Sequence, residues 1–318
     1  MAKTTIQKPA AAANSNTNKT QMAEEKRLEV LKTYKIYMGG QFPRTESGRY
    51  YTATNNKGQH LANICLCSRK DVRDAVVSAR GAFGGWSSRA AFNRGQILYR
   101  IAEMLEGRKA QFIDELVKQD ATTAQATAEV NLAIDRLIYY SGWCDKFQQV
   151  FSSVNPVASA HFNFSAPEPT GVVAAIAPQN SSLIGLVSII APIIAGGNTC
   201  VVLASASKPL CAVTFGEVLN SSDVPGGVVN ILTGKPAELL PYLADHMDIN
   251  ASIYCETDAA AQQLLKEKAA LNIKRVFIYD TINWMKEEAQ SPYFITDLQE
   301  IKTTWHPIEN IGGGKAGY

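Results

Sequence analysis

The sequence has no large net charge, no closely spaced pair of cysteines of the kind that binds metal, and no long apolar run without interruption. Its 31 lysines and arginines nearly balance 29 aspartates and glutamates, and the net charge of +2 indicates neither nucleic-acid binding nor an acidic surface. Six cysteines form no Cys-x-x-Cys motif and four histidines are scattered, so we expect neither a metal site nor a disulfide framework. Pro192, Gly196 and Gly197 interrupt the most apolar run, which excludes a membrane span there.

Residues 1–33 form a polar segment that we expect to be disordered or bound to a partner, because it contains too little apolar surface to fold alone. No acidic residue precedes Glu24, a feature shared with mitochondrial transit peptides, but the segment has no arginine before Arg27 and no apolar periodicity. No secretory signal is visible either. We therefore expect a cytoplasmic protein, with a mitochondrial location as the less favoured alternative.

Two apolar runs without polar alternation, residues 172–177 and 199–204, predict strands buried on both faces, as in a parallel sheet covered by helices. Between them, apolar residues recur at helical spacing after Ser181 or Ser182, either of which can cap the helix. The glycines at 196–197 predict its end. Strand, helix and strand joined by short connections make a right-handed βαβ unit, whose strand ends line a ligand-binding crevice in such sheets.

The part of the chain before this unit predicts a hairpin and then helices. Gly39 and Gly40 predict a tight turn between short strands. Further on, apolar residues at helical spacing predict several helices, including a long one over residues 124–150. Residues 151–168 contain prolines and alternate in polarity, which predicts a protruding hairpin.

Three more predicted strands follow the unit, at residues 228–232, 251–255 and 275–279, and helices alternate with them. About five parallel strands with helices between them predict an α/β fold with a doubly wound, Rossmann-like, mostly parallel sheet. We expect one domain over residues 34–280 and a C-terminal extension over residues 281–318.

Three motifs resemble the cofactor-binding domain of the aldehyde dehydrogenase superfamily. They are the Gly-Val-Val-Ala-Ala-Ile-Ala-Pro run from Gly171, the Ala-Pro-Ile-Ile-Ala-Gly-Gly-Asn run from Ala191 and the Val-Pro-Gly-Gly run from Val224. The short form of the chain is most similar to the non-catalytic second unit of the family-16 aldehyde dehydrogenases. The resemblance implies the cofactor-domain fold, and in that family such a unit contributes to packing between subunits.

The resemblance also implies which positions would bind the cofactor. Asn180 matches the asparagine that stabilises the oxyanion of the intermediate. Ala204 and Ser207 stand where the family has the lysine and glutamate that hold the adenosine ribose, and neither can replace the charged group. Lys208 follows too late in the chain, and we interpret it as a solvated loop charge.

Other expected positions of the family are also altered. Glu256 and Thr257 stand where the family turns into a helix that binds the dinucleotide phosphates, and a carboxylate there repels phosphate. Tyr279 occupies the place of the general-base glutamate, and Asp280 is one residue out of register. Cys255 has no basic neighbour in the sequence, so we interpret it as a core thiol. No cysteine follows it, and we expect the catalytic domain to be absent.

These altered positions predict a catalytically inactive pseudoenzyme without a bound cofactor or metal, which acts as a structural or assembly subunit. Its partner would be an intact aldehyde dehydrogenase chain, a second copy of itself, or a large organelle or cytoskeletal assembly. The alternative is a non-catalytic nucleotide-sensing regulatory subunit that uses the crevice near Asn180.

Overall fold

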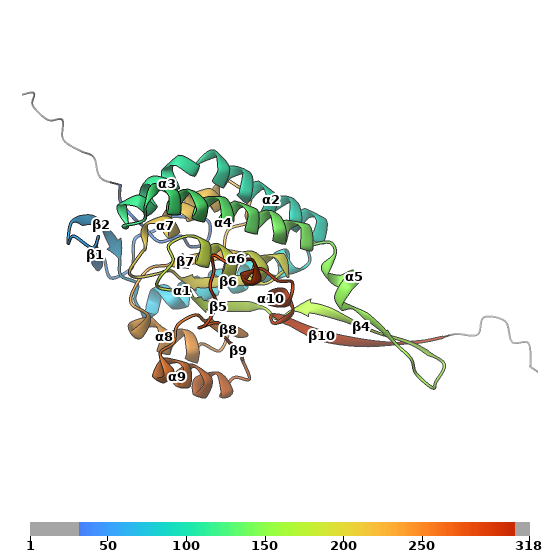
Figure 1. Cartoon of the computed structure of the whole chain (residues 1–318). Helices are drawn as coiled ribbons and strands as arrows, with labels where there is room; N and C mark the ends of the chain where they lie inside the picture. The colour runs from blue at the N-terminus through green and yellow to red at the C-terminus, as the bar shows by residue number, and fades with distance from the viewer. Residues whose placement is uncertain (1–31, 309–318) are drawn as a thin grey trace, which may run out of the picture. The chain divides into compact units, whose positions relative to one another are not determined.

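The computed structural model describes residues 32–308, and the polar segment up to residue 31 and residues 309–318 lie outside this part. Strands and helices alternate along most of it (Figure 1). The described strands have the following bounds: β1 Tyr50–Thr54, β2 His60–Cys65, β3 Ser153–Asn155, β4 His161–Pro169, β5 Val172–Ile176, β6 Thr199–Leu203, β7 Val229–Leu232, β8 Ala251–Tyr254, β9 Arg275–Ile278 and β10 Gln299–Pro307.

The helices range from single turns to about six turns. Their bounds are α1 Arg69–Ser87, α2 Ala91–Gly107, α3 Lys109–Lys118, α4 Thr123–Trp143, α5 Phe147–Phe151, α6 Ile184–Ala195, α7 Leu210–Asn220, α8 Pro236–Asp245, α9 Ala259–Ala270, the short 3₁₀ helix Glu287–Ala289 and α10 Tyr293–Thr296. Within residues 32–308, no helix is long and apolar enough to cross a membrane.

Five parallel strands form the central sheet in the order β7-β6-β5-β8-β9. β5 lies in the middle, with Val172 opposite Thr199 of β6 and Val173 opposite Ala251 of β8. Every residue of β5 and β6 is buried, which agrees with their continuous apolar sequence. The predicted doubly wound parallel sheet is therefore confirmed.

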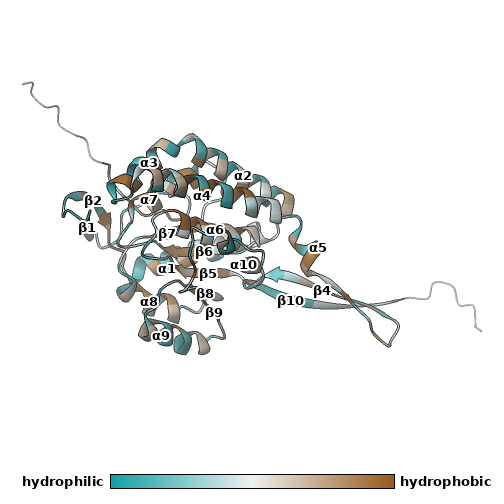
Figure 2. Ribbon diagram, in the orientation of Figure 1, coloured by the Kyte–Doolittle hydropathy of each residue, from teal (hydrophilic) through white to brown (hydrophobic). Residues whose placement is uncertain are grey.

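Helices cover both faces of this sheet. α6 and α7 pack on one face together with α2, α3 and α4, whereas α1, α8 and α9 pack on the other. Figure 1 shows the first group above the sheet and α8 and α9 below it. The hydropathy colouring in Figure 2 shows teal on the outer turns of α9, where the helix meets solvent.

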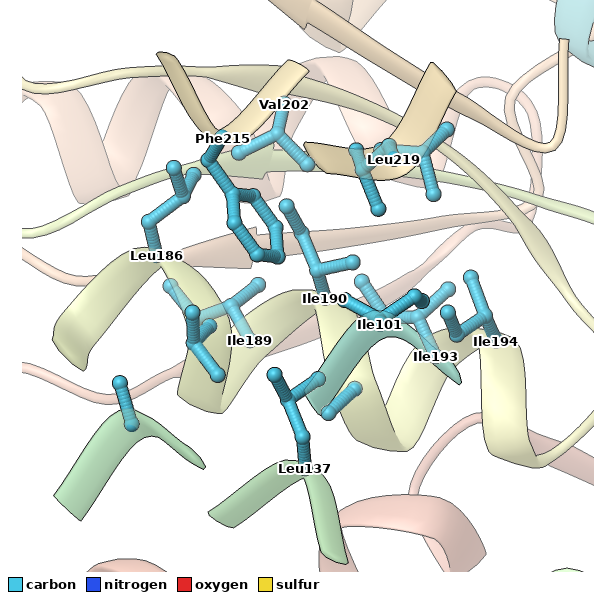
Figure 3. Close-up of a cluster of buried hydrophobic side chains, with 14 of the residues drawn as sticks. Ile101, Leu137, Leu186, Ile189, Ile190, Ile193, Ile194, Val202, Phe215 and Leu219 are labelled. Carbon is cyan, nitrogen blue, oxygen red and sulfur yellow. The ribbon is translucent and has the colours of Figure 1, made fainter. Parts of the chain in front are cut away.

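α6 is the most buried helix of the described chain, since all of its residues from Ile184 to Ala195 are buried. Its side chains contact the sheet on one side and α2, α4 and α7 on the others. Figure 3 shows this packing through the following residues: Ile101, Leu137, Leu186, Ile189, Ile190, Ile193, Ile194, Val202, Phe215 and Leu219. A helix that is apolar on all sides must be covered on all sides.

The carboxyl end of α6 receives side-chain donors from distant segments. The indole N–H of Trp86 donates to the carbonyl oxygen of Ile194 (3.0 Å), and Arg94 Nε donates to that of Ala195 (3.2 Å). Gln299 donates to the carbonyl oxygen of the next residue, Gly196. These side-chain donors supplement the backbone bonds of the following turn at the last carbonyl groups of the helix, which have no N–H partner within the helix.

The predicted long helix over residues 124–150 is wrong, because the structure divides it into α4 and α5. A turn over residues 144–146 separates them. Gly142, near the end of α4, lowers the helix propensity there. The turn directs Phe147 into the core, where its ring stacks on Phe151 at 4.7 Å between centroids.

A second sheet has the order β10-β4-β3. β3 and β4 form a hairpin in the region where the sequence predicts a protrusion. β10 pairs with β4 along nine residues, from Gln299 opposite Pro169 to Pro307 opposite His161. Figure 1 shows β4 and β10 running side by side away from the helices. The described part of the C-terminal extension thus completes this sheet.

The segment between β9 and β10 packs against α4 and α6 through Arg136. This fully buried guanidinium donates to the hydroxyl of Ser188 and to the carbonyl oxygens of Trp284, Lys286 and Ala289. Burial lowers its pKa from the ordinary value. Arg136 therefore connects residues 284–289 to the two helices.

We expect Arg136→Met to lower the free energy of unfolding by about 3 kcal/mol, because a buried acceptor that loses its donor costs about 1–3 kcal/mol. Urea unfolding would measure this loss, and amide hydrogen exchange should accelerate at residues 284–289. The control is Arg100→Met, which removes an exposed ion pair with Glu103 and should change stability by less than about 1 kcal/mol. Equal losses in the two variants would contradict the role of Arg136.

Candidate functional site

The candidate site lies at the carboxyl ends of β5, β6 and β8. β5 has β6 on one side and β8 on the other, so the strand order changes direction between β5 and β8. Open α/β sheets bind ligands at such a switch point, because the loops diverge there. The loops after these three strands contain Asn180, Ala204, Ser207 and Glu256, which the sequence analysis singles out.

Gln179, in the loop after β5, connects the three loops by hydrogen bonds. Its backbone N–H donates to Glu256 Oε1 (2.5 Å). Its backbone oxygen accepts from the hydroxyl groups of Ser205 and Ser207, and its side-chain oxygen accepts from the backbone N–H of Ala206 (2.7 Å). These bonds hold the loops against one another across the switch point.

A protein carboxylate occupies the first turn of α6. Glu129 Oε1, from α4, accepts the backbone N–H groups of Leu183 (3.0 Å) and Ile184 (3.1 Å). The N–H of Gly185 donates to the hydroxyl of Ser181 (2.9 Å). Unpaired N–H groups and the helix dipole make a helix N-terminus attractive to anions. At α6, these three N–H groups are already paired within the protein.

The loop before α9 is also acidic. Asp258 caps α9 by accepting the N–H groups of Ala260 (3.0 Å) and Ala261 (3.2 Å). Glu256 precedes it in the same loop and holds the loop after β5. Thr257 is exposed between the two acidic residues. Both helices that begin at the switch point therefore carry carboxylates from this chain at their N-termini.

Comparisons with known proteins agree with this architecture. The family model described as "Aldehyde dehydrogenase family" matches residues 42–278. The mitochondrial 10-formyltetrahydrofolate dehydrogenase of Homo sapiens is 30% identical over 80% of this chain and 28% of its own length. The cytosolic 10-formyltetrahydrofolate dehydrogenase of Mus musculus is 30% identical over 79% of this chain and 28% of its own length.

The chain belongs to the aldehyde dehydrogenase family. A crystal structure of aldehyde dehydrogenase C from Pseudomonas syringae with NAD+ and octanal aligns with a TM-score of 0.70 and 28% identity, over 77% of this chain and 50% of that one. This chain thus spans about half of that structure and less than a third of the two formyltetrahydrofolate dehydrogenases. The predicted aldehyde dehydrogenase resemblance and its fold are confirmed.

The positions that the family resemblance assigns to cofactor and oxyanion binding have other contacts. Asn180 is exposed, and its backbone oxygen accepts from Lys208 Nζ (3.1 Å). Lys208 lies in the loop before α7 and has intermediate exposure, and its hydrogen bond to Asn180 is exposed, so its interpretation as a loop charge stays a prediction. Ala204 is buried and has no polar side-chain atom. The hydroxyl of Ser207 donates to Gln179, as described above.

Tyr279, at the position assigned to the family's general base, is a hydrogen-bond donor here. Its hydroxyl donates to Asp297 Oδ2 (2.7 Å), and burial, together with the Asp297 carboxylate, raises its pKa above the ordinary tyrosine value. A tyrosine that stays neutral cannot accept a proton from water. The neighbouring Asp280 accepts from the side chain of Gln262 (2.9 Å).

Cys255 is 6% exposed at the end of β8, and burial raises the pKa of its thiol well above the ordinary value, with the Glu256 carboxylate adding to the effect. A thiolate is the nucleophilic form of cysteine, so this environment disfavours reactivity. Within residues 32–308, no three histidine, cysteine or acidic side chains are grouped so that they could hold a metal ion.

Sequence reasoning missed the main contact at α6. The prediction of Ser181 or Ser182 as the cap is wrong in part, because the helix begins at Ile184 and Glu129 accepts its first N–H groups. Ser182 donates to the carbonyl oxygen of Lys208 instead. Glu129 lies more than 50 residues upstream in another helix, so no local pattern indicates this contact.

Glu129→Ala should lower the free energy of unfolding by about 1–2 kcal/mol, the usual effect of losing a helix cap. Glu129→Gln keeps a side-chain oxygen and should lose less. Hydrogen exchange of the Leu183 and Ile184 amides would locate the effect. Glu103→Ala, on the exposed face of α2, is the control. A change in exchange confined to α2 and α4 would contradict the assignment.

Cys255 should not react with iodoacetamide in the folded protein at pH 8, because its thiol is buried and protonated. Mass spectrometry of native Cys255→Ser should show the same labelling as the unchanged chain. After denaturation, the variant should carry one label fewer. Rapid native labelling of Cys255 would show an accessible thiolate and contradict this expectation.

Proposed function

We propose that this chain is a catalytically inactive member of the aldehyde dehydrogenase family that acts as a structural or assembly subunit. The supporting observation is that carboxylates of the protein itself occupy the anion-attracting N–H groups at the switch point. Glu129 accepts hydrogen bonds from the first N–H groups of α6, and Asp258 accepts them from N–H groups of α9. Glu256 accepts one from the N–H of Gln179.

A dinucleotide would have to bring its phosphates into this acidic loop. Two unit charges about 4 Å apart near a protein surface repel by about 4 kcal/mol, which corresponds to roughly a thousandfold weaker binding. The protein also offers no charged group at Ala204 or Ser207 to hold a ribose. The residues present therefore do not fit a family-type dinucleotide, and we derive no chemical step through one.

The groups available for chemistry support the same proposal. The thiol of Cys255 and the hydroxyl of Tyr279 both have raised pKa values, so neither supplies a nucleophile or a base near neutral pH. Among the site positions of the family, Asn180 is the one that keeps the family's residue. Its side chain could polarise a carbonyl group, but the described residues offer no nucleophile or base to act with it. An assembly role, in contrast, fits the exposed second sheet.

We expect no thermal shift of the full chain with about 1 mM NAD or NADP, and no heat of binding by calorimetry. A site with a dissociation constant of about 10 μM would stabilise the protein by about 2.7 kcal/mol under these conditions. Glu256→Gln removes the negative charge and tests whether Glu256 is the reason that the cofactor does not bind. Weak binding of NAD or NADP by this variant would support repulsion by Glu256. The control is Glu238→Gln, in the first turn of α8 and paired with Arg49.

A saturable shift of the unchanged chain would overturn this proposal. It would instead support the nucleotide-sensing subunit, in which the crevice near Asn180 binds a nucleotide without chemistry. A parallel assay for oxidation of aldehydes with either cofactor completes the test, because turnover would overturn both functions.

A further inference from the structure

A groove lies between the first turns of α1 and the end of α8, two helices that pack against each other on one face of the central sheet (Figure 1). Its volume is about 750 Å³, which is within the range of pockets that bind small molecules. None of its lining residues belongs to the candidate site. The lining residues are Arg69, Lys70, Val72, Arg73, Tyr242, Asp245, His246 and Met247.

The groove offers apolar surface for a ligand. Val72 borders it and is buried, whereas Tyr242 and Met247 are 41% and 81% exposed beside it. The flexible thioether side chain of methionine adapts to apolar ligands of different shape. The aliphatic stems of Arg69 and Arg73 add further apolar surface. The groove can therefore cover an alkyl chain.

The wall of the groove that α1 forms is cationic, because it contains Arg69, Lys70 and Arg73. Lys70 Nζ lies 3.8 Å from Glu46, and Arg73 pairs with the adjacent Asp74 at 3.3 Å. Both pairs are exposed, and exposed ion pairs contribute at most about 1 kcal/mol. A bound anion can therefore compete with these carboxylates for the two cations.

Arg69 has neither a carboxylate partner nor a hydrogen-bond acceptor within residues 32–308. Its guanidinium instead lies over the ring of Tyr242, 5.7 Å from the ring centroid. A planar guanidinium can donate two parallel hydrogen bonds to the two oxygens of one carboxylate. Arg69 is thus available to bind the carboxylate of a ligand in the groove.

The other ionisable groups of the groove leave this positive charge in place. Asp245 is the one acidic residue that lines it, and its carboxylate lies 3.5 Å from Lys268 of α9. Burial lowers the pKa of His246, and its Nδ1 accepts the N–H of Asp248. The imidazole is therefore neutral near pH 7, and the positive charge comes from α1 alone.

We propose that this groove binds a fatty-acid anion, with the carboxylate at Arg69 and the alkyl chain over Val72, Tyr242 and Met247. One unpaired guanidinium matches one carboxylate, and the apolar surface beside it matches the chain. A small polar anion would use the charge but leave the apolar surface exposed to water. The inference is independent of the proposed function, because it uses none of the residues at the switch point.

Dodecanoate below its micelle concentration is the probe, and it is titrated into the full chain. We expect saturable binding by calorimetry and a saturable shift of the Met247 methyl signal when the methionine methyl groups are labelled with ¹³C. Met285, which is 46% exposed and lies outside the groove, is the internal control and should not shift. Binding should tighten from octanoate to dodecanoate by up to about fourfold for each methylene that the groove covers.

Variants test the two halves of the groove separately. Arg69→Gln should weaken dodecanoate binding about three- to tenfold and reduce its dependence on salt, because the charge-assisted hydrogen bonds are lost. Its control is Arg100→Gln, an exposed arginine of α2, which should leave the affinity unchanged. Met247→Ser should reduce the gain in affinity per methylene, whereas Met285→Ser should not. Equal weakening by the two arginine variants would overturn the assignment of the carboxylate to Arg69.

Vesicles of phosphatidylglycerol and phosphatidylcholine distinguish a free fatty acid from a membrane surface. We expect the full chain to stay in the supernatant when these vesicles are sedimented. Sedimentation with the vesicles, without a shift of Met247 by dodecanoate, would identify a membrane-binding face and overturn the proposal. No saturable binding of dodecanoate up to about 1 mM would also overturn it, and so would equal binding of the cationic dodecyltrimethylammonium.

Discussion

The complete burial of α6 is the constraint on which the rest of the structure depends. Each side of this helix is covered, so its polar ends cannot reach water and must be paired inside the protein. The partners come from far along the chain: Glu129 at the amino end, and Trp86, Arg94 and Gln299 at the carboxyl end. One helix thus connects α1, α2, α4 and the start of β10.

The same constraint affects the candidate site. The N–H groups at the start of α6 can be satisfied by a ligand or by the protein, and Glu129 satisfies them from within. Asp258 does so at α9. A chain that pairs these groups internally gains stability without a ligand, and the same pairing removes a binding determinant. The same carboxylates therefore stabilise the helix ends and occupy the N–H groups at the candidate site.

Much of the fold could be predicted from the sequence, because it depends on local patterns. Apolar runs predicted the five parallel strands, and helical periodicity predicted most helices between them. The division at residues 144–146 was not predictable, since the burial of Phe147 depends on tertiary packing. Within the site, the family motifs assign positions such as Ala204 to cofactor binding, and the prediction that they no longer bind a cofactor stays a prediction. The contacts of Glu129 and Gln179 were not, because they join residues distant in sequence.

β10 is mostly exposed, whereas the middle strands of the central sheet are fully buried. Strands of the parallel sheet have helices on both faces, and β6, β5 and β8 also have a neighbouring strand on each side. The second sheet has only three strands, and its edge residues Ile301 and Trp305 remain exposed. A thin sheet buries little apolar surface by itself. Its polar ladder Asn155, Asn163, Ser165 and Thr303 connects the three strands by side-chain hydrogen bonds. The second sheet therefore depends on these side-chain bonds as well as on its backbone ladder, because much of its surface is exposed.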